Sequence, residues 1–525
     1  MADEIAVVNF GGQTTHLINR RIRELGVKSR IINSKEATLE ELLQLKGVIL
    51  SGGPASCTDK DAPPYPEGLL EIGIPTLRIC YTMQLSAHKL PGGEVLPGKK
   101  REYGPNNIEI ALQDDLFEGL PGELKVWMSH GDTVSKPPFG YQVTAMTENG
   151  LIAAMSNSDK RAHCVQFHPE VTHTEHGMDM LSNFVYNIAG CTKGSWDLKQ
   201  HVEQVKDYLG ETIQGRDVIV FVSGGVDSTV AATILAKAKA EGRNVGNTYA
   251  VHIDNGLMRT NESAEVVEYL RKQPGLEQVI FKDYSSIFLE RLKGVVDPEE
   301  KRKRIGDSFM KECREAIMKE LGLTEDNTVL CQGTLYTDII ESGGAEQSAR
   351  IKTHHNRSPE VLKKIAEGKI VEPNRDLYKD DARAEGELLG IPRELLWRHP
   401  FPGPGLAIRI VGGDVTPERL AILRQADDIY ISEIKKAGIY DQIWQAFAVL
   451  LAGSQAVGVG GDGRTYQYPI VLRAVESKDG MTADWYALPQ DLQRRISTRI
   501  TNEVAGVNRV VVDISSKPPA TIEWE

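Results

Sequence analysis

DVIVFVSGGVDSTVAATILAKAKA, residues 217–240, is the stretch that decides the fold class. Residues 218–222 are apolar and mostly β-branched, which predicts a buried strand. A Ser-Gly-Gly turn follows, and residues 229–240 are rich in Ala and Lys, which favour a helix. A strand, a glycine turn and a helix in direct succession are typical of an α/β domain, in which helices connect parallel strands.

The same succession occurs at the start of the chain. IAVVNF (5–10) predicts a strand, Gly11-Gly12 a turn, and the residues up to about 25 an amphipathic helix. Further strands are expected at 47–52 (GVILSG), 75–80 (PTLRIC), 163–168 (HCVQFH) and 248–254 (TYAVHID). The pattern therefore predicts two α/β domains, each built on a parallel sheet.

Two stretches mark the expected domain boundaries. Residues 191–195 precede a helical pattern, and HPFPGPG (399–405) has too many Pro and Gly residues for a regular element. The last part carries one long helical pattern, at about 417–437, and strands such as PIVLRAVE and RVVVDI, which indicates a smaller α+β domain. We expect domains at 1–194, 195–399 and 400–525.

Composition excludes several function classes. The chain has 525 residues and a net charge of −12, which disfavours sequence-independent binding to nucleic acid. It has no run of about 20 apolar residues and no signal-like N-terminus, so we expect neither a membrane span nor secretion. Its six cysteines are scattered, without a CxxC pair, which argues against a zinc site or a disulfide framework and favours a reducing, cytoplasmic compartment.

Cys80 lies where a catalytic thiol would be expected. It ends a predicted strand and precedes a helical stretch, so a sharp turn would project its side chain beside a helix N-terminus, which favours the thiolate. His168 also follows a strand, and Glu170 comes two residues later. Cys80, His168 and Glu170 can form a nucleophile–base–carboxylate triad if the fold brings the strand ends together. Taken singly, such a Cys is more often a core residue.

SGGVDS (223–228) predicts a phosphate-binding loop. Its glycines let backbone N–H groups turn inward, and the following helix N-terminus attracts an anion. Asp227 faces phosphates only if a cation lies between, so we expect Mg²⁺ there. The loop lacks the GxxxxGK[ST] pattern of the Walker type, and a plain strand–helix turn is the alternative. The expected ATP-binding residues are Ser223, Gly224, Gly225, Val226, Asp227 and Ser228.

Four segments of the first domain together resemble the class I glutamine amidotransferases. They are SGGP (51–54), CYTMQ (80–84), WMSHGD (127–132) and QFHPEVTH (166–173). The resemblance implies that Cys80 is the nucleophile, His168 the general base and Glu170 the carboxylate that orients it. It also implies that Gly53 and Tyr81 donate N–H groups to an oxyanion hole and that Gln84, Ser129, His130 and Asp132 hold glutamine.

The second glycine loop resembles that of the N-type ATP pyrophosphatases, and segments along nearly the whole chain resemble the GMP synthase family. They include VHIDNGLMRTNE (251–262), HPFPGPGLAIR (399–409) and SKPPATIEWE (516–525). The resemblance implies amination of XMP to GMP with glutamine as nitrogen donor and ATP as co-substrate, through an adenylated XMP. It implies a homodimer, a lid carrying His354 and His355, and XMP contacts from Arg302, Gln445, Lys517 and Glu523.

The chain departs from the family pattern at a few positions, which leaves alternatives open. The family elbow has Gly two residues before and after the nucleophile, where this chain has Arg78 and Thr82; Gln455 replaces a usual Arg. The alternatives are a synthetase that uses only free ammonia and a catalytically silent nucleotide-binding protein. An NAD or asparagine synthetase shares the phosphate loop, but its glutaminase module is of another type.

Overall fold

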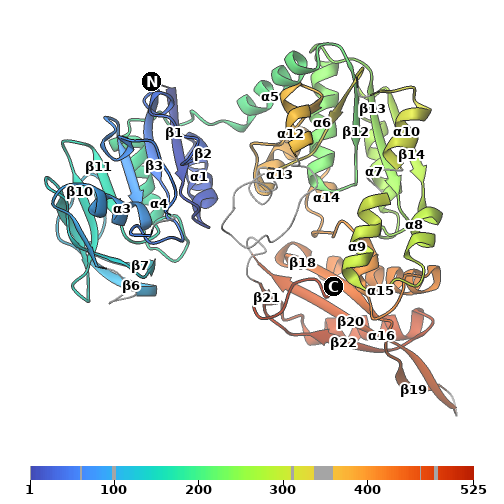
Figure 1. The fold of residues 1–525 in the computed structure, drawn as a ribbon. Coiled ribbons are helices and arrows are strands. Elements are labelled where there is room, and N and C mark those ends of the chain that lie inside the picture. Colours follow the sequence, from blue (N-terminus) through green and yellow to red (C-terminus); the bar gives the residue numbers. More distant parts are fainter. Residues whose placement is uncertain are drawn as a thin grey trace. The chain divides into compact units, whose positions relative to one another are not determined.

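The computed structural model describes residues 2–59, 62–96, 102–308, 313–324, 326–335, 359–460, 463–477 and 483–525. These residues fall into two compact units, which divide between His201 and Val202. Both units are drawn in Figure 1, coloured along the sequence. None of the described helices is long and apolar enough to cross a membrane.

The first unit contains a nine-stranded mixed sheet. Five neighbouring strands are parallel, and the remaining four continue the sheet in antiparallel pairs. In spatial order they are β2 (Lys28–Asn33), β1 (Ala2–Asn9), β3 (Leu45–Leu50), β4 (Thr76–Ile79), β11 (Ala162–Val165), β10 (Ile152–Asn157), β9 (Gln142–Thr147), β6 (Glu102–Ile110) and β7 (Glu123–His130). A separate pair, β5 (Glu94–Leu96) and β8 (Thr133–Lys136), is antiparallel.

Each face of this sheet has its own hydrophobic core. One contains Leu77 and Ile79 of β4 with residues of α1 (Thr15–Glu24) and α4 (Gly177–Ser182). The other contains Val48 and Leu50 of β3 with residues of α3 (Tyr81–Lys89). Because β-strand side chains alternate between faces, both cores draw on the same strands. The remaining helical segments are α2 (Leu39–Leu42), η1 (Leu69–Glu71) and η2 (Asn183–Ile188).

The second unit begins with a five-stranded parallel sheet. Its spatial order is β14 (Gln278–Asp283), β13 (Thr248–Asp254), β12 (Asp217–Phe221), β15 (Thr328–Cys331) and β16 (Ile370–Val371). In chain order this is 3-2-1-4-5, so the direction of strand addition reverses between β12 and β15. In open α/β sheets ligands bind outside the carboxyl ends of the strands at such a point.

Helices surround this parallel sheet, and α6, the helix that follows β12, packs against α13. The helices are α5 (Leu198–Ile213), which crosses the boundary between the units, α6 (Val226–Ala240), α7 (Glu262–Arg271), α8 (Ser285–Leu292), α9 (Pro298–Asp307), α10 (Arg314–Glu320), α12 (Pro359–Ala366), α13 (Lys379–Leu388) and α14 (Arg393–Leu396). A short segment, η5 (Gly405–Arg409), leads into the last part of the chain.

The last part of the second unit is a sheet with helices on one face, as Figure 1 shows in orange and red. β17 (Ile410–Val411), β18 (Gln445–Leu451), β20 (Gly463–Glu476) and β19 (Ala456–Gly460) follow in this order, and β21 (Asp484–Trp485) and β22 (Val507–Asp513) also pair with β20. α15 (Pro417–Lys436) and α16 (Gln490–Glu503) pack on one face, η6 (Tyr440–Gln442) precedes β18, and the core beneath them continues into the parallel-sheet part.

The expected fold class is confirmed, and the expected strands correspond to the parallel part of the first sheet. IAVVNF, GVILSG, PTLRIC and HCVQFH overlap β1, β3, β4 and β11, respectively. The antiparallel half was not expected, because strands such as β7 alternate buried and exposed residues and give only a weak apolar signal. The three-domain division at 194 and 399 stays a prediction.

Candidate active sites

Cys80 occupies a strained turn between β4 and α3. Its φ is +52° and its ψ is −103°, a conformation that residues other than glycine rarely adopt. The Cys80 N–H donates to the Val165 carbonyl at 2.8 Å, which ties the turn to the end of β11. Tyr81 is the first residue of α3, so its N–H has no partner inside the helix. The turn is therefore the expected nucleophile elbow.

His168 and Glu170 lie beside this thiol. His168 Nδ1 is 2.7 Å from Glu170 Oε1, and the imidazole is hydrogen-bonded to the Cys80 side chain. Burial alone lowers the pKa of His168, but the negative charge of Glu170 and the hydrogen bonds to Cys80 and Glu170 raise this pKa well above its ordinary value. The structure thus brings the three predicted residues together as sulfur, base and orienting carboxylate.

The Gly52-Gly53 turn after β3 packs close to Cys80, His168 and Tyr81. A Cβ on Gly52 would lie 3.2 Å from the His168 ring and 3.6 Å from Cys80 Cβ. A Cβ on Gly53 would meet the Phe10 carbonyl oxygen at 2.7 Å, closer than real Cβ atoms approach. Only glycine lets this backbone come so near the thiol, which fits the expected oxyanion-hole role of Gly53 and Tyr81.

The side chains expected to hold glutamine gather around the end of β7 and α3. Gln84 Nε2 donates to the Asp132 carbonyl at 2.8 Å, and His130 Nδ1 lies 2.9 Å from the same oxygen. The Ser129 carbonyl is 3.7 Å from Cys80 Sγ. Burial lowers the pKa of His130, although Glu102, 3.3 Å away, partly opposes this effect. All four predicted residues therefore border the thiol or one another.

Gln166 is a contact of the nucleophile that the sequence analysis did not single out. Its side chain is buried, and its Nε2 lies 3.5 Å from Cys80 Sγ. The signal was in the sequence, because Gln166 precedes His168 by two residues in QFHPEVTH. Its position became clear only from the strand register, in which Val165 pairs with Ile79 and Gln166 therefore lies next to Cys80.

Arg78 and Thr82, the two departures at the elbow, are both accommodated. The buried Arg78 guanidinium donates to the Leu70 carbonyl at 2.7 Å, to Ser86 Oγ at 2.9 Å and to Tyr141 OH at 3.0 Å. Thr82 Oγ1 accepts from the Ile79 N–H at 2.9 Å and donates to a β3 carbonyl. These hydrogen bonds go to groups outside the triad, and the turn keeps its shape without the two glycines.

The SGGVDS loop joins β12 to α6 at the reversal of strand order. Gly224 has a φ of +90°, and Gly225 is the N-cap of α6. Ser228 Oγ accepts from the Ser223 N–H at 3.2 Å, which closes the loop on itself. Ser223 and Gly225 are exposed, whereas Val226 is buried and anchors the helix start. The loop therefore presents hydroxyls, backbone N–H groups and a helix N-terminus to solvent, as a phosphate cradle must.

The peptide that follows Asp227 is held from two neighbouring strands. Asn374, after β16, donates its side-chain N–H to the Asp227 carbonyl at 2.7 Å. Gly333, after β15, packs so closely that a Cβ would lie 2.6 Å from the same oxygen. The sequence analysis singled out neither residue, because their nearness to the loop depends on the sheet order.

The donor set at the loop fits Mg²⁺ bound mainly through a substrate. Asp227 offers one carboxylate beside the cradle, and Mg²⁺ commonly binds one or two carboxylates together with phosphate oxygens and water. Among the described residues, no group of three or more His, Cys, Asp or Glu side chains could hold a metal by itself.

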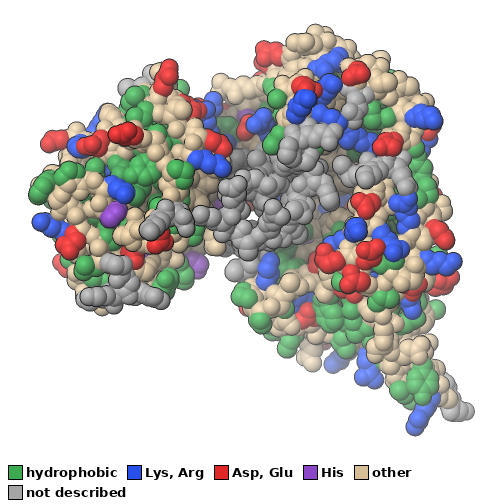
Figure 2. Space-filling view, viewed as in Figure 1, with side chains coloured by type: hydrophobic (Ala, Val, Ile, Leu, Met, Phe, Trp, Pro, Cys, Tyr) green, Lys and Arg blue, Asp and Glu red, His purple; other side chains and the backbone are tan. Residues whose placement is uncertain are grey.

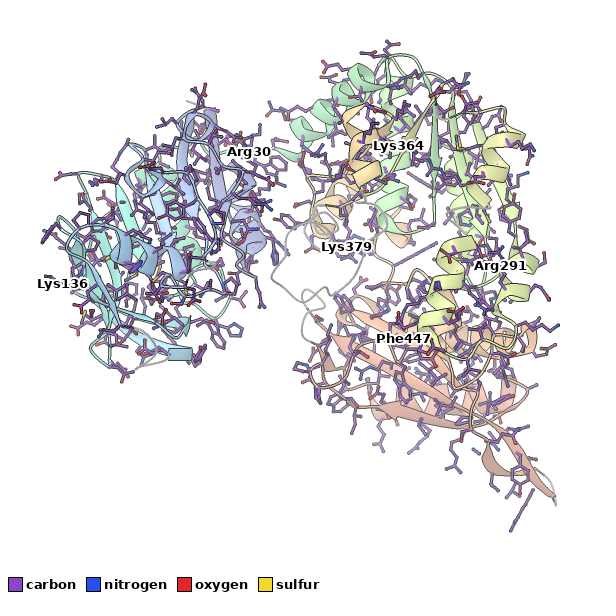
Figure 3. All side chains as sticks on the ribbon, in the orientation of Figure 1. Arg30, Lys136, Arg291, Lys364, Lys379 and Phe447 are labelled. Carbon is purple, nitrogen blue, oxygen red and sulfur yellow. The ribbon has the colours of Figure 1, made fainter. Side chains whose placement is uncertain are left out.

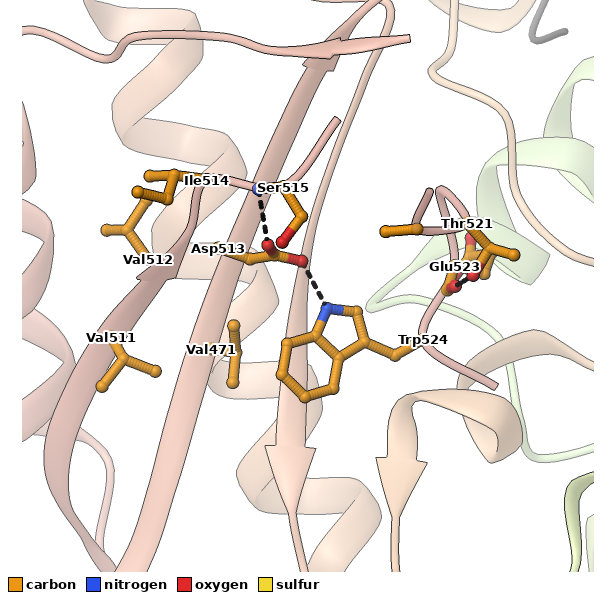
Figure 4. Close-up of a pocket in the computed structure, with 10 residues that line it drawn as sticks. Val471, Val511, Val512, Asp513, Ile514, Ser515, Thr521, Glu523 and Trp524 are labelled. Atoms are coloured by element: carbon orange, nitrogen blue, oxygen red, sulfur yellow. Dashed lines mark hydrogen bonds between the residues drawn. The ribbon is translucent and has the colours of Figure 1, made fainter. Parts of the chain in front are cut away.

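Two of the four predicted XMP contacts meet near the end of the chain. Gln445 Nε2 donates to Glu523 Oε1 at 2.8 Å, and the fully buried Arg409 pairs with the same carboxylate, also at 2.8 Å. Arg409 lies over the ring of Phe447, which Figure 3 labels, at 4.2 Å from the ring centroid. A hollow of about 550 Å³ beside Glu523 is lined by residues of β20, β22 and the terminal segment, with a hydrogen bond from Trp524 to Asp513 (Figure 4).

The other two predicted XMP contacts have different neighbours. Lys517 pairs with Ala483 through its backbone, with N···O distances of 2.7 and 3.0 Å. Arg302 forms an ion pair with Glu299 on the same helix, α9. Its neighbour Lys301 is fully buried and reaches Glu525 at 2.8 Å, so the charge run EEKRKR is not simply a solvated face. His354 and His355 lie outside the described residues.

Comparisons with known proteins identify the family of the chain. Residues 6–188 match the family model for class I glutamine amidotransferases, and residues 432–524 match the model for the GMP synthase C-terminal domain. A curated relative from Aquifex aeolicus, named GMP synthase [glutamine-hydrolyzing], is 49% identical over 99% of both chains. Two further relatives of the same name are each 48% identical. The one from Solidesulfovibrio magneticus matches over 100% of this chain and 99% of its own length. The one from Carboxydothermus hydrogenoformans matches over 100% of both chains.

Proposed function

The chain belongs to the glutamine-hydrolysing GMP synthase family, and on that premise we propose how its two sites act in series. The first unit releases ammonia from glutamine, and the second uses ATP to activate XMP so that ammonia can convert it to GMP. The observation that carries this proposal is the arrangement of Cys80, His168 and Glu170 at a positive-φ turn.

At the first site the Cys80 thiolate attacks the side-chain amide carbon of glutamine and forms a C–S bond. The N–H groups of Gly53 and Tyr81 face the developing oxyanion, and His168 gives its proton to the departing nitrogen as the C–N bond breaks. Water, deprotonated by His168, then cleaves the thioester to glutamate and frees the thiol. Glu170 keeps the imidazole oriented throughout.

At the second site the O2 atom of XMP attacks the α-phosphorus of ATP. Pyrophosphate leaves, and the product is an adenylated XMP whose leaving group is AMP instead of a poor oxide. Ammonia then attacks C2, AMP departs, and GMP forms. Ser223, Gly224, Gly225 and Ser228 would hold the pyrophosphate portion through hydroxyls and backbone N–H groups.

Mg²⁺, held by Asp227 and phosphate oxygens, would neutralise charge on the polyphosphate. Asn374 and Gly333 then keep the Asp227 peptide in place beneath the nucleotide. This support of the loop is provided by the chain itself and does not require the ion.

The acceptor nucleotide would bind where Gln445 and Glu523 meet. Their contact to each other and to Arg409 supports this location, because it gathers polar groups at the edge of a hollow. Arg302 and Lys517 would complete the site by contacting the phosphate. Glu523→Gln is expected to raise the KM for XMP at least tenfold while leaving the KM for ATP within about twofold.

We also propose that the chain works as a cytoplasmic homodimer through its last sheet. Val511, Ile514 and Trp524 are 40%, 63% and 39% exposed; Val511 lies in β22, Ile514 directly follows this strand, and Trp524 is hydrogen-bonded to Asp513 at its end. Apolar side chains grouped in this way commonly mark an interface. Sedimentation should show a dimer, and Val511→Lys should shift it toward the monomer; a monomer at every concentration would contradict the proposal.

One paired assay tests the main proposal. GMP formation is measured with glutamine and with ammonium salt, in the native chain and in Cys80→Ala. We expect the native chain to use both nitrogen sources and the variant to use ammonium only.

The other outcomes separate the alternatives. Use of ammonium alone by the native chain would mean an ammonia-dependent synthetase, and use of neither would mean a silent nucleotide-binding protein. Pyrophosphate release with aspartate or deamido-NAD, but not with XMP, would indicate a different synthetase. The geometry of the elbow favours the glutamine-dependent reading, because Arg78 and Thr82 form hydrogen bonds with groups outside the triad.

A further inference from the structure

A chain of three hydrogen-bonded groups ends on the catalytic sulfur. The Asp132 carbonyl accepts from Gln84 Nε2 at 2.8 Å, Gln84 Nε2 also donates to Gln166 Oε1 at 3.2 Å, and Gln166 Nε2 lies 3.5 Å from Cys80 Sγ. Gln84 and Gln166 are 4% and 1% exposed, so water cannot readily substitute for any of these partners.

The Asp132 carbonyl sets the orientation of the two amides in this row of hydrogen bonds. A backbone carbonyl can only accept, so the Gln84 amide must turn its amino group toward Asp132. The second proton of that amino group then points at an acceptor, which fixes Gln166 with its oxygen toward Gln84. The amino group of Gln166 is therefore left facing the sulfur.

The backbone supports the same orientation. Gln166 follows β11 directly, and its N–H donates to the Ala153 carbonyl of β10 at 2.8 Å. Cys80 follows β4, the parallel neighbour of β11, and its N–H donates to the Val165 carbonyl, also at 2.8 Å. The sulfur and the amide are thus held by two adjacent, fully buried strands, not by mobile loops.

We propose that Gln166 is a catalytic residue of the glutaminase site, which donates an N–H to the Cys80 thiolate and, with His168, holds the sulfur in its reactive form. This inference rests on the proposed function of the first unit. A thiolate accepts hydrogen bonds more strongly than a thiol does, so a preoriented donor favours the charged form. Gln84 is a positioning residue in this scheme, because it acts on the sulfur only through Gln166.

The experiment measures the alkylation of Cys80 by iodoacetamide as a function of pH in Gln166→Met. Methionine keeps the length and volume of the side chain but cannot donate to sulfur. The rate of carbamidomethylation is followed by mass spectrometry on the Cys80 peptide, with Cys80→Ala as the blank. We expect the midpoint of the pH–rate profile to rise by about one unit, because hydrogen bonds to charged groups are worth about that much.

Two further measurements distinguish a change in thiol ionisation from misfolding of the variant. The plateau rate at high pH, where the thiol is ionised in both proteins, should remain within about twofold if the site is folded. Glutamine-driven GMP formation should fall about tenfold at pH 7, whereas ammonium-driven formation reports the second unit alone. Loss of both would indicate failure of the synthetase, not of this inference.

Gln84→Met serves as the second variant. This variant keeps the Gln166 amide but removes the Gln84 contact that orients it. We therefore expect the midpoint of the pH–rate profile to rise by less than in Gln166→Met. An unchanged midpoint in Gln166→Met, with an unchanged plateau, would overturn the inference and leave Gln166 as a packing residue.

Discussion

At the scale of single residues, Arg78 shows how a large cation can replace a small residue beside a tight turn. Its guanidinium reaches three oxygens, on Leu70, Ser86 and Tyr141, within one core of the first unit. Ser86 belongs to α3 and Leu70 to η1, so Arg78 joins the helix that follows the nucleophile to a neighbouring segment. Arg78 therefore has a structural role, although it lies only two residues before Cys80.

Arg78→Met should destabilise the first unit without removing its activity at low temperature. The substitution leaves three buried acceptors without their donor, a loss of about 2–3 kcal/mol. We expect the midpoint for heat inactivation of glutamine-driven GMP formation to fall by about 5 °C or more. Arg20→Met is the matched control, because Arg20 lies near the surface and forms an i,i+4 ion pair with Glu24. Equal shifts in the two variants would show that the Arg78 contacts contribute nothing.

His399 gives the second unit a pH dependence of predictable sign. Burial, followed by other effects that include the Arg259 charge, lowers the pKa of His399 to about 4. Its Nδ1 accepts a hydrogen bond from the Ala446 N–H at 3.1 Å. A proton on Nδ1 would therefore point at this N–H, which is itself a donor. The unfolded chain takes up that proton near pH 6.5 and the folded chain does not.

The stability contributed by neutral His399 is thus present above about pH 6.5 and is lost as the pH falls toward 4. At pH 5 the loss amounts to about 2 kcal/mol. Calorimetry at pH 7 and pH 5 should show a smaller drop in the unfolding temperature for His399→Gln than for the native chain. Parallel drops in the two proteins would assign the pH dependence to other groups.

The roles of Cys80, His168 and Glu170 stay predictions, but their proximity could be expected from the sequence because chemistry and local spacing coincide there. His168 and Glu170 are two positions apart, and the strand-to-helix transition at Cys80 is visible in the sequence. Gln166 and Lys301 were missed for a different reason. The first depends on the register of two strands and the second on the chain terminus folding back, and neither has a local signature.

At the scale of elements, the phosphate loop depends on the strands beside it as much as on its own sequence. The segments that follow β15 and β16 carry the residues that approach the Asp227 peptide, namely Gly333 and Asn374. The loop sequence predicts the turn, but the parallel order β12-β15-β16 brings the residues that support its backbone next to it. Interactions of this kind follow from topology and cannot be read from a motif.

Gly333→Ala should therefore impair ATP use. Its Cβ would overlap the Asp227 carbonyl at 2.6 Å, and the backbone of the loop would have to move. We expect the KM for ATP in the ammonium-driven reaction to rise at least tenfold, because misplaced donors lose their phosphate contacts. Asn374→Leu removes one hydrogen bond and should raise this KM by about fivefold.

Gly306→Ala is the matched control for that experiment. Gly306 lies in α9 of the same unit, and a Cβ there would meet no atom within 4 Å. Alanine also suits a helix better than glycine, so this variant should retain its KM for ATP and gain slightly in stability. A normal KM for ATP in Gly333→Ala would mean that the loop is not held from β15.

The elements themselves were predicted most accurately where patterns are long. The helix expected at 417–437 is α15, with Pro417 at its first position and Thr416 Oγ1 accepting from the Arg419 N–H at 3.3 Å. The strand expected at 248–254 has the observed bounds of β13. The antiparallel strands of the first unit escaped prediction, because their half-exposed faces weaken the periodic signal.

At the scale of the whole molecule, acidic and basic side chains are interspersed over the face that Figure 2 shows, which agrees with small-molecule substrates more than with a polyanion. On the proposed function, the two units would carry separate chemistries, one on a thiol and one on a phosphate loop. Free ammonia made in one unit would be lost to solvent if glutamine were hydrolysed before the acceptor was activated. Less ammonia would be lost if glutamine were hydrolysed only when the second site is occupied.

We expect XMP and ATP together to raise the rate of glutamate release at least tenfold over the rate with glutamine alone, a coupling free energy of about 1.4 kcal/mol or more. Glutamate is measured directly, so the readout does not depend on GMP formation. Glu523→Gln, which weakens the proposed acceptor contact, should need more XMP for the same stimulation while its basal glutamate release stays unchanged, because Glu523 lies in the other unit. Equal glutamate release with and without the two nucleotides would mean that the sites act independently, and ammonia would then reach the second site only by diffusion.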